Sequence, residues 1–130
     1  MRAAGDLTRI LLIEDDDDIR TVTVSALELV GGFSVRACGS AAQGLEAIAE
    51  FGPQLVLLDV MMPGMDGVQL LAELRRRADT AALPVVFLTA KARTEEISRL
   101  RGLGALGVIA KPFDPMTLAE QVRSLWKGSS

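Results

Sequence analysis

Four places in the sequence put chemically reactive side chains directly after a run of apolar residues. Glu14 and Asp15 follow the first run, Asp59 follows the third, and Thr89 and Lys111 follow the fourth and fifth. The carboxyl ends of parallel strands meet at one edge of an open sheet, which is where such sheets bind ligands. If these runs are neighbouring parallel strands, one crevice gathers three carboxylates, a hydroxyl group and an ammonium group.

Such a crevice carries excess negative charge. Three carboxylates outnumber the single ammonium group, and each pair of like charges at close range costs on the order of a few kcal/mol. A divalent cation offsets this repulsion. Because the donors are hard oxygens with no imidazole or thiolate beside them, we expect Mg²⁺, which keeps several waters and binds phosphate oxygens. The residue types therefore indicate phosphoryl chemistry.

Asp59 is the best nucleophile of this set. A carboxylate can form an acyl phosphate, and transfer then depends on positioning and on neutralising the charge of the phosphoryl oxygens. The cation, Lys111 and the Thr89 hydroxyl could each bind one of these oxygens. Asp59 ends the run expected to be the central strand, and the next residues, MMPGMDG at 61–67, predict a loop that leaves the crevice open.

The elements that position these residues follow from hydrophobic periodicity. Short apolar runs alternate with longer segments of helical period, which is typical of parallel strands joined by crossover helices. Four runs are nearly all apolar, as expected for strands covered on both faces, whereas 33–37 alternates and predicts an edge strand. We predict a doubly wound α/β sheet with five helices and the strands Ile10–Ile13, Phe33–Ala37, Leu55–Leu58, Val85–Leu88 and Gly107–Ala110.

Capping residues between these strands predict where helices begin. Ser40 and Asp66 each precede a glutamine by three residues, which is the spacing of a capping box. Thr94 is expected to cap a helix with acidic residues in its first turn, and Asp114 to cap one that starts at Pro115. The stretch 102–107 has G-x-G-x-x-G spacing, but it follows a helix and precedes a strand, so we interpret it as a helix end and turn.

The first helix is expected from about Asp17 to Leu29. Its apolar stripe would consist of Ile19, Val22, Ala26 and Val30. We interpret Asp17 or Asp18 as a solvated residue that caps this helix rather than as a metal ligand, because acidic residues favour a helix N-terminus.

The composition excludes several other classes of function. The chain has no histidine and a single cysteine, Cys38, which excludes zinc sites and histidine-based catalysis. A net charge of −3 gives no general attraction for nucleic acid, and the basic run at 75–77 is interpreted as the solvated end of a helix. No long apolar segment is present, so we expect no membrane anchor and a cytoplasmic location.

The whole chain resembles the receiver family of two-component response regulators, including the single-domain regulators of chemotaxis. The resemblance rests on LLIEDD at 11–16, LLDVMMPGMDG at 57–67, LTA at 88–90 and KPF at 111–113. It implies a flavodoxin-like parallel sheet with the strand order 2-1-3-4-5, and one receiver domain over 1–130 with its core at about 8–127. Met1 and the abrupt end slightly favour a complete regulator over a fragment.

The resemblance implies a phosphorelay role. Asp59 would accept a phosphoryl group from a histidine kinase or a histidine phosphotransfer protein, with Thr89 and Lys111 assisting. The signal would pass to an unidentified output protein through the face formed by the fourth helix, the fifth strand and the fifth helix. We expect no enzymatic activity beyond promotion of its own phosphorylation and slow autodephosphorylation.

The resemblance also implies how the cation is bound. Mg²⁺ would be held by Asp15, by Asp59, by the Met61 carbonyl and by Glu14 through a water. A cis peptide bond between Lys111 and the following proline would aim the lysine into the site.

One position departs from the family pattern, and two other functions remain open. Val108 stands three residues before the lysine, where the family usually has an aromatic ring, so we expect a different coupling to output. An aspartate-nucleophile phosphohydrolase would use the same groups, but the commonest such family has an acid where this chain has Met61. A degenerate receiver that only binds partners is disfavoured by the complete set of reactive residues.

Overall fold

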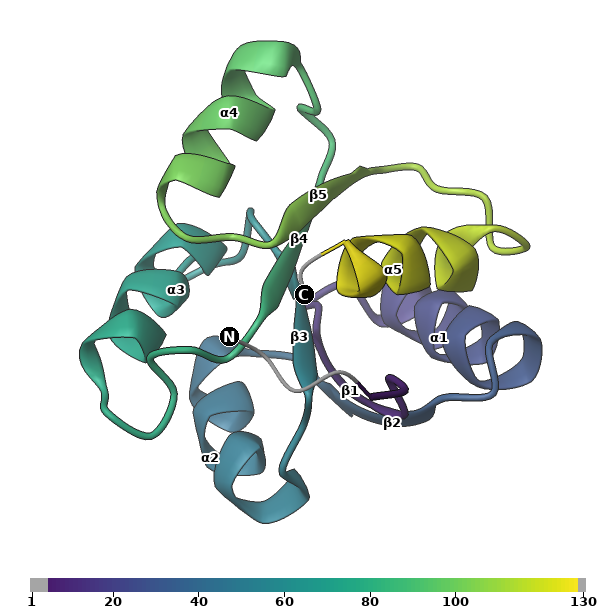
Figure 1. Cartoon of the computed structure of the whole chain (residues 1–130), viewed down its shortest axis with the longest axis horizontal. Coiled ribbons are helices and arrows are strands. Elements are labelled where there is room, and N and C mark those ends of the chain that lie inside the picture. The colour runs from purple at the N-terminus through teal and green to yellow at the C-terminus, as the bar shows by residue number, and fades with distance from the viewer. Residues whose placement is uncertain (1–4, 129–130) are drawn as a thin grey trace.

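The computed structural model describes residues 5–128, which form a parallel sheet of five strands in the order β2-β1-β3-β4-β5 (Figure 1). The order implied by the resemblance is confirmed. Each strand lies within one residue of its expected run at both ends, and the strands are β1 (Arg9–Ile13), β2 (Ser34–Cys38), β3 (Leu55–Asp59), β4 (Val85–Thr89) and β5 (Gly107–Ala110).

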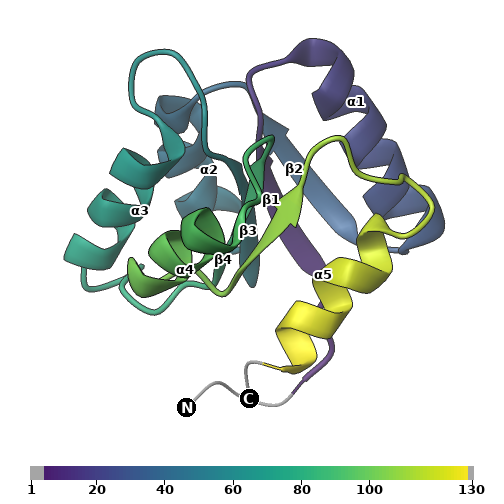
Figure 2. The same ribbon diagram turned by 90° about the horizontal axis from the view of Figure 1, so that it is seen from above.

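Helices cover both faces of the sheet. One face carries α1 (Asp17–Ser25), which continues into the π-helical turn η1 (Ala26–Val30), and α5 (Leu118–Lys127). The other carries α2 (Ala41–Phe51), α3 (Gly67–Arg76) and α4 (Thr94–Gly102) (Figure 1; Figure 2). Successive strand side chains point to opposite faces, so Leu11 and Ile13 join the core under α2 to α4, while Ile10 and Leu12 join the core under α1 and α5. Within residues 5–128, no helix is both long enough and apolar enough to cross a bilayer.

The hydrophobic pattern of the sequence predicts one edge strand of the sheet but not the other. The alternating run at 33–37 is confirmed as an edge, because among residues 5–128 β2 pairs only with β1. β5 forms the opposite edge, which its apolar composition did not indicate. Its alternate residues Val108 and Ala110 are half-buried and exposed, whereas Gly107 and Ile109 are buried, so α5 covers one side of β5 better than α4 covers the other.

The helix caps expected at Ser40 and Asp66 are confirmed. Ser40 Oγ accepts a hydrogen bond from the backbone N–H of Gln43 at 3.2 Å. Asp66 and Gln69 form a complete capping box at the start of α3. This box fixes the end of the loop that follows β3, and that loop borders the crevice.

The other expected caps are wrong. Asp16, and not Asp17 or Asp18, caps α1, because its carboxylate accepts a hydrogen bond from the Ile19 N–H at 2.9 Å. Thr94 is the first residue of α4, and Arg93 stands in the capping position without a side-chain hydrogen bond. The last helix begins at Leu118 rather than at Pro115. The Asp114 carboxylate accepts from the N–H of Met116 at 2.9 Å, so it closes a local turn instead of capping the helix.

The expected apolar stripe of the first helix is wrong in two of its members. Val22 and Val30 are 46% and 45% exposed, whereas Thr23, Ala26 and Leu27 are buried. The Thr23 hydroxyl donates to a backbone carbonyl one turn earlier at 2.6 Å, so burying it leaves no polar group unsatisfied. A polar residue on the buried side concealed the true inner face of this helix.

The basic run at 75–77 is only partly solvated. Arg76 and Arg77 are exposed as expected, but Arg75 is half-buried and donates to the carbonyls of Leu83 and Gly104 at 2.9 Å each. The glycine-rich stretch 102–107 is confirmed as a helix end and turn, with Gly104 at a φ of +109°.

Candidate functional site

Strand ends deliver all five predicted side chains to the carboxyl edge of the sheet. Asp59 and Thr89 are the last residues of β3 and β4, Glu14 and Asp15 follow β1, and Lys111 follows β5. The parallel pairing of β1, β3, β4 and β5 keeps these ends level with one another. The five residues therefore come from four adjacent strands, although they lie up to 97 positions apart in the chain.

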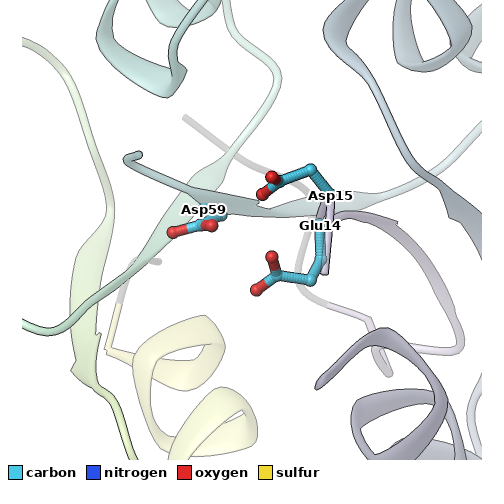
Figure 3. A group of neighbouring side chains, drawn as sticks. All are labelled: Glu14, Asp15 and Asp59. Atoms are coloured by element: carbon cyan, nitrogen blue, oxygen red, sulfur yellow. The ribbon is translucent and has the colours of Figure 1, made fainter. Parts of the chain in front are cut away.

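Three carboxylates form a cluster that could hold a divalent cation. One oxygen from each of Glu14, Asp15 and Asp59 lies within 4.8 Å of the others, and Figure 3 shows the Glu14 and Asp15 carboxylates pointing toward Asp59. Glu14 and Asp59 are buried, whereas Asp15 is exposed and leaves the cluster open to solvent on one side. An oxygen-only donor set with an open side fits Mg²⁺, which keeps some of its waters.

The Lys111 ammonium group binds the two buried carboxylates. Its Nζ lies 3.1 Å from Glu14 Oε1 and 3.2 Å from Asp59 Oδ1. The peptide bond between Lys111 and Pro112 is cis, as the resemblance implied. Burial disfavours the charged lysine, but the hydrogen bonds and negative charges of the two carboxylates outweigh it and raise the pKa of Lys111 above its ordinary value.

Glu14 is the most perturbed acid of the site. Burial raises the pKa of its carboxyl from 4.5 to about 7, and the nearby Asp59 adds to this effect. Hydrogen bonds from the Asp16 N–H, at 3.1 Å from Oε2, and from Lys111 act in the opposite direction. Without a cation, Glu14 can therefore carry a proton near neutral pH, and a bound cation would favour the ionised form.

Thr89 is buried at the end of β4 with its own proton free to be donated. Its Oγ1 accepts a hydrogen bond from the backbone N–H of Lys91 at 3.0 Å. A hydroxyl group that accepts through oxygen still has one O–H to donate. Thr89 thus links the strand end to the loop that leads into α4.

The comparison with known families agrees with this geometry. The family model of the response regulator receiver domain matches residues 10–123, a range that contains every residue of the site. The chain belongs to this family. Receiver domains are the phosphoacceptor domains of two-component systems, and they generally bind Mg²⁺.

Individual relatives resemble this receiver domain over part of their own length. The chain is 40% identical over 121 residues to the transcriptional regulatory protein CseB of Streptomyces coelicolor, covering 93% of this chain and 50% of that protein. It is 38% identical over 121 residues to the phosphate regulon regulatory protein PhoB of Escherichia coli, covering 92% and 52%. The chain thus spans about half the length of these relatives. A solved structure of a sensor protein from Polaromonas sp. JS666 is 33% identical with a TM-score of 0.83, covering 95% of this chain and 98% of that one.

Met61 and Lys91, which stand two residues after Asp59 and two residues after Thr89, lie at the surface of the receiver domain. Met61 is 69% exposed, and Lys91 is also exposed. The Met61 N–H donates to Asp59 Oδ1 at 3.3 Å, which holds the start of the loop against the carboxylate. Whether the Met61 carbonyl is a cation ligand stays a prediction.

Two apolar residues of α1, the half-buried Ile19 and the exposed Val22, lie beside the site of the receiver domain. Ile19 and Val22, which were expected on the inner stripe of the helix, line a mostly apolar groove. The other residues that line it are Asp18, Ala90, Lys111, Pro112 and Phe113. The groove runs from α1 to the segment after β5. The surface next to the carboxylate cluster is therefore apolar on this side.

Arg20 is a residue near the site that the sequence reasoning missed. Its guanidinium Nη1 donates to the backbone carbonyl of Glu14 at 2.8 Å. The only signal in the sequence is its place six residues after Glu14, in the second turn of the helix that follows the acidic run. That spacing alone does not distinguish it from a solvated arginine.

Proposed function

We propose that Asp59 is the residue that accepts the phosphoryl group in this receiver domain. The observation that carries the proposal is the position of the Lys111 ammonium, 3.2 Å from Asp59 Oδ1, beside a cluster of carboxylates within 4.8 Å of one another. Glu14, Asp15, Asp59 and the Met61 carbonyl would hold Mg²⁺, which supplies positive charge to the phosphoryl oxygens when bound.

Asp59, Lys111 and Thr89 would have different roles in phosphoryl transfer. The ionised Asp59 carboxylate attacks phosphorus, a new O–P bond forms, and the bond to the donor atom breaks with its electron pair leaving on the donor. Phosphorylation removes the negative charge of the Asp59 carboxylate that pairs with Lys111, so the lysine ammonium would bind one phosphoryl oxygen instead. The Thr89 hydroxyl would donate a hydrogen bond to a second phosphoryl oxygen, because its own oxygen already accepts a hydrogen bond from the Lys91 N–H.

The donor and the output lie outside this chain. No histidine is present, so the phosphoryl group would come from the imidazole of a separate histidine kinase or histidine phosphotransfer protein. We propose that residues 1–130 act as one receiver module in the cytoplasm. It would serve as a binding switch rather than as an enzyme, and signal through α4, β5 and α5 to a protein partner, without binding nucleic acid itself.

Acetyl phosphate with Mg²⁺ tests the assignment. Intact mass spectrometry should show one added phosphoryl group on the wild type and none on Asp59→Asn. Asp79→Asn, which changes an exposed aspartate in the loop before β4, is the matched control and should be modified like the wild type. Modification of Asp59→Asn at the wild-type rate would remove Asp59 from this role.

A further inference from the structure

A side chain from α1 holds the peptide group between Glu14 and Asp15. Arg20 Nη1 donates to the Glu14 carbonyl at 2.8 Å, and Nη2 donates to the carboxylate of Asp17. The Arg20 side chain is only 25% exposed, whereas that of Asp17 is 87% exposed. The fork of the guanidinium therefore ties the second turn of α1 back to the end of β1.

Space for this guanidinium is left by a glycine. A Cβ atom built on Gly39, which follows β2, would lie 3.2 Å from Arg20 Nη1, which is tighter than nine in ten real Cβ contacts. The same β2 end accepts the Glu14 N–H, through the Cys38 carbonyl at 3.0 Å. The backbone of Glu14 is thus held on its N–H side by β2 and on its carbonyl side by Arg20.

Asp15 depends on this backbone more than the other two acids do. The Glu14 and Asp59 carboxylates are each held by Lys111 and by a backbone N–H. In contrast, no hydrogen bond or ion pair among residues 5–128 ends on the Asp15 side chain. Its carboxylate nevertheless points toward Asp59 (Figure 3). The peptide group held by Arg20 is bonded directly to the Asp15 Cα, so its orientation contributes to this direction.

We infer that Arg20 is a positioning residue for the cation: it fixes the Glu14–Asp15 peptide group and thereby presents the Asp15 carboxylate to Mg²⁺. This inference rests on the proposed function. The pairing with Asp17 offsets the positive charge of the guanidinium, so the donor can stand beside a cation site with little repulsion of the cation.

Positioning and simple electrostatics predict opposite effects of removing Arg20. Loss of a positive charge near a cation site should by itself tighten Mg²⁺ binding, because it removes repulsion. Loss of the hydrogen bond to the Glu14 carbonyl should weaken binding, because Asp15 is no longer held in place. Removing a residue that orients a metal ligand commonly weakens metal affinity by roughly 10-fold or more.

Isothermal titration of the metal-free proteins with Mg²⁺ tests the inference. We expect Arg20→Met to raise the Kd about tenfold and Arg20→Lys, which keeps the charge and one donor, to raise it by roughly threefold. Arg76→Met removes an exposed arginine from the far end of α3 and should leave the Kd unchanged. The Mg²⁺ concentration that half-saturates phosphorylation by acetyl phosphate should rise in parallel, while the rate at saturating Mg²⁺ stays near that of the wild type.

The outcomes separate this inference from the proposed function. Wild-type protein that neither binds Mg²⁺ nor gains a phosphoryl group on Asp59 would overturn both. If the wild type does both and Arg20→Met binds Mg²⁺ equally or more tightly, the positioning role of Arg20 is wrong and the assignment of Asp59 stands. If circular dichroism shows that Arg20→Met does not fold, Arg20→Lys decides, and an unchanged or lower Kd for that variant rejects the role.

Discussion

The ammonium group of Lys111 lies 3.2 Å from Asp59 Oδ1 and 3.1 Å from Glu14 Oε1, so a single cation bridges the two buried acids of the receiver site. Asp59 is the last residue of β3 and Glu14 follows β1, and these two strands are neighbours in the sheet. Lys111 reaches both acids from the end of β5, at the edge of the sheet. This bridge sets the charge balance of the site before any phosphoryl group arrives.

Lys111→Met should slow phosphorylation by acetyl phosphate by about 100-fold, which is typical for the loss of one group that stabilises developing negative charge. Mg²⁺ affinity should not fall, because removing an ammonium group from beside three carboxylates removes repulsion of the cation. A time course of the phosphorylated mass at saturating Mg²⁺ measures the rate, with Lys127→Met as the charge-matched control. A rate within threefold of the wild type would show that Lys111 does not assist transfer.

Glu14→Gln should stabilise the metal-free protein above neutral pH. Burial raises the pKa of Glu14 from 4.5 to about 7, so between these values the folded chain binds more protons than the unfolded chain, and the free energy of unfolding falls as pH rises. Glutamine lacks this ionisation. The free energy of unfolding of Glu14→Gln should therefore exceed that of the wild type by an amount that grows from pH 5 to pH 8 and reaches on the order of 2 kcal/mol.

Urea unfolding in EDTA at pH 5, 6.5 and 8 measures that gain. Glu46→Gln, at an exposed position on α2, is the control and should show no such growth. A gain for Glu14→Gln that is the same at all three pH values, or a loss at pH 8, would contradict the burial argument.

Asp15→Ala should separate metal binding from folding. Removal of one carboxylate relieves like-charge repulsion, so the metal-free variant should have a Tm at least as high as the wild type. Ligand that binds only the folded state raises the Tm, and this variant should gain less when Mg²⁺ is added. Differential scanning calorimetry with and without Mg²⁺ measures the Tm of the wild type and of Asp15→Ala. An equal Mg²⁺-dependent increase in Tm for the two proteins would show that Asp15 is not a ligand.

Phosphorylation should be transmitted from Thr89 to the loop that precedes α4. The Thr89 hydroxyl accepts from Lys91 N–H at 3.0 Å, so movement of Thr89 toward a phosphoryl oxygen should carry residues 90–94 with it. Val108 is half-buried and has no ring to rotate, so we expect the loop to carry most of the change. Amide chemical shifts in 90–108 should change on phosphorylation of the wild type and of Thr89→Ser, but much less in Thr89→Ala. Changes confined to residues that touch Asp59 would reject this route.

The phosphorylated state should decay slowly when the protein is alone. Hydrolysis needs a water oriented toward phosphorus, but the Met61 thioether is a weak acceptor and the Lys91 ammonium is only a donor. Met61 is 69% exposed, so a different side chain there can reach solvent without disturbing the core. Met61→Asn with Lys91→Glu should shorten the lifetime about tenfold, equivalent to roughly 1.4 kcal/mol of barrier. Decay of the phosphorylated mass after removal of acetyl phosphate measures it, and an unchanged or slower decay would show that these residues do not control water access.

Much of the site could be predicted because its residues are set by strand ends. An apolar run of four or five residues followed by a carboxylate, a hydroxyl or an ammonium fixes both the strand and the residue at its end, as at Asp59, Thr89 and Lys111. The parallel sheet then places these ends together whatever the intervening sequence. Strands buried on both faces also leave little freedom in their boundaries, which is why the expected runs of β1, β3 and β4 lie within one residue of these strands.

Where the predictions from sequence were wrong, the same residues could serve two local arrangements, and the folded chain uses the one that was not expected. The inner face of α1 includes Thr23, whose hydroxyl can be satisfied within the helix, so periodicity alone favoured the more apolar but exposed Val22. At Asp114 the same carboxylate can cap a helix or close a turn, and the folded chain uses it for the turn.

Several properties of the site depend on contacts between residues that are far apart in the chain, so they arise only in the folded protein. The pKa of Glu14 follows from complete burial beneath neighbouring elements, and its bridge to Lys111 spans 97 positions. The contact of Arg20 with the Glu14 carbonyl needs the helix after β1 to pack so that the guanidinium enters the space left by Gly39. The residue types and their spacing were enough to predict which groups would react and at which strand ends they would stand. The raised pKa values of Glu14 and Lys111, and the contacts that hold the site, arise from packing, because desolvation and hydrogen-bond geometry exist only once the layers are assembled.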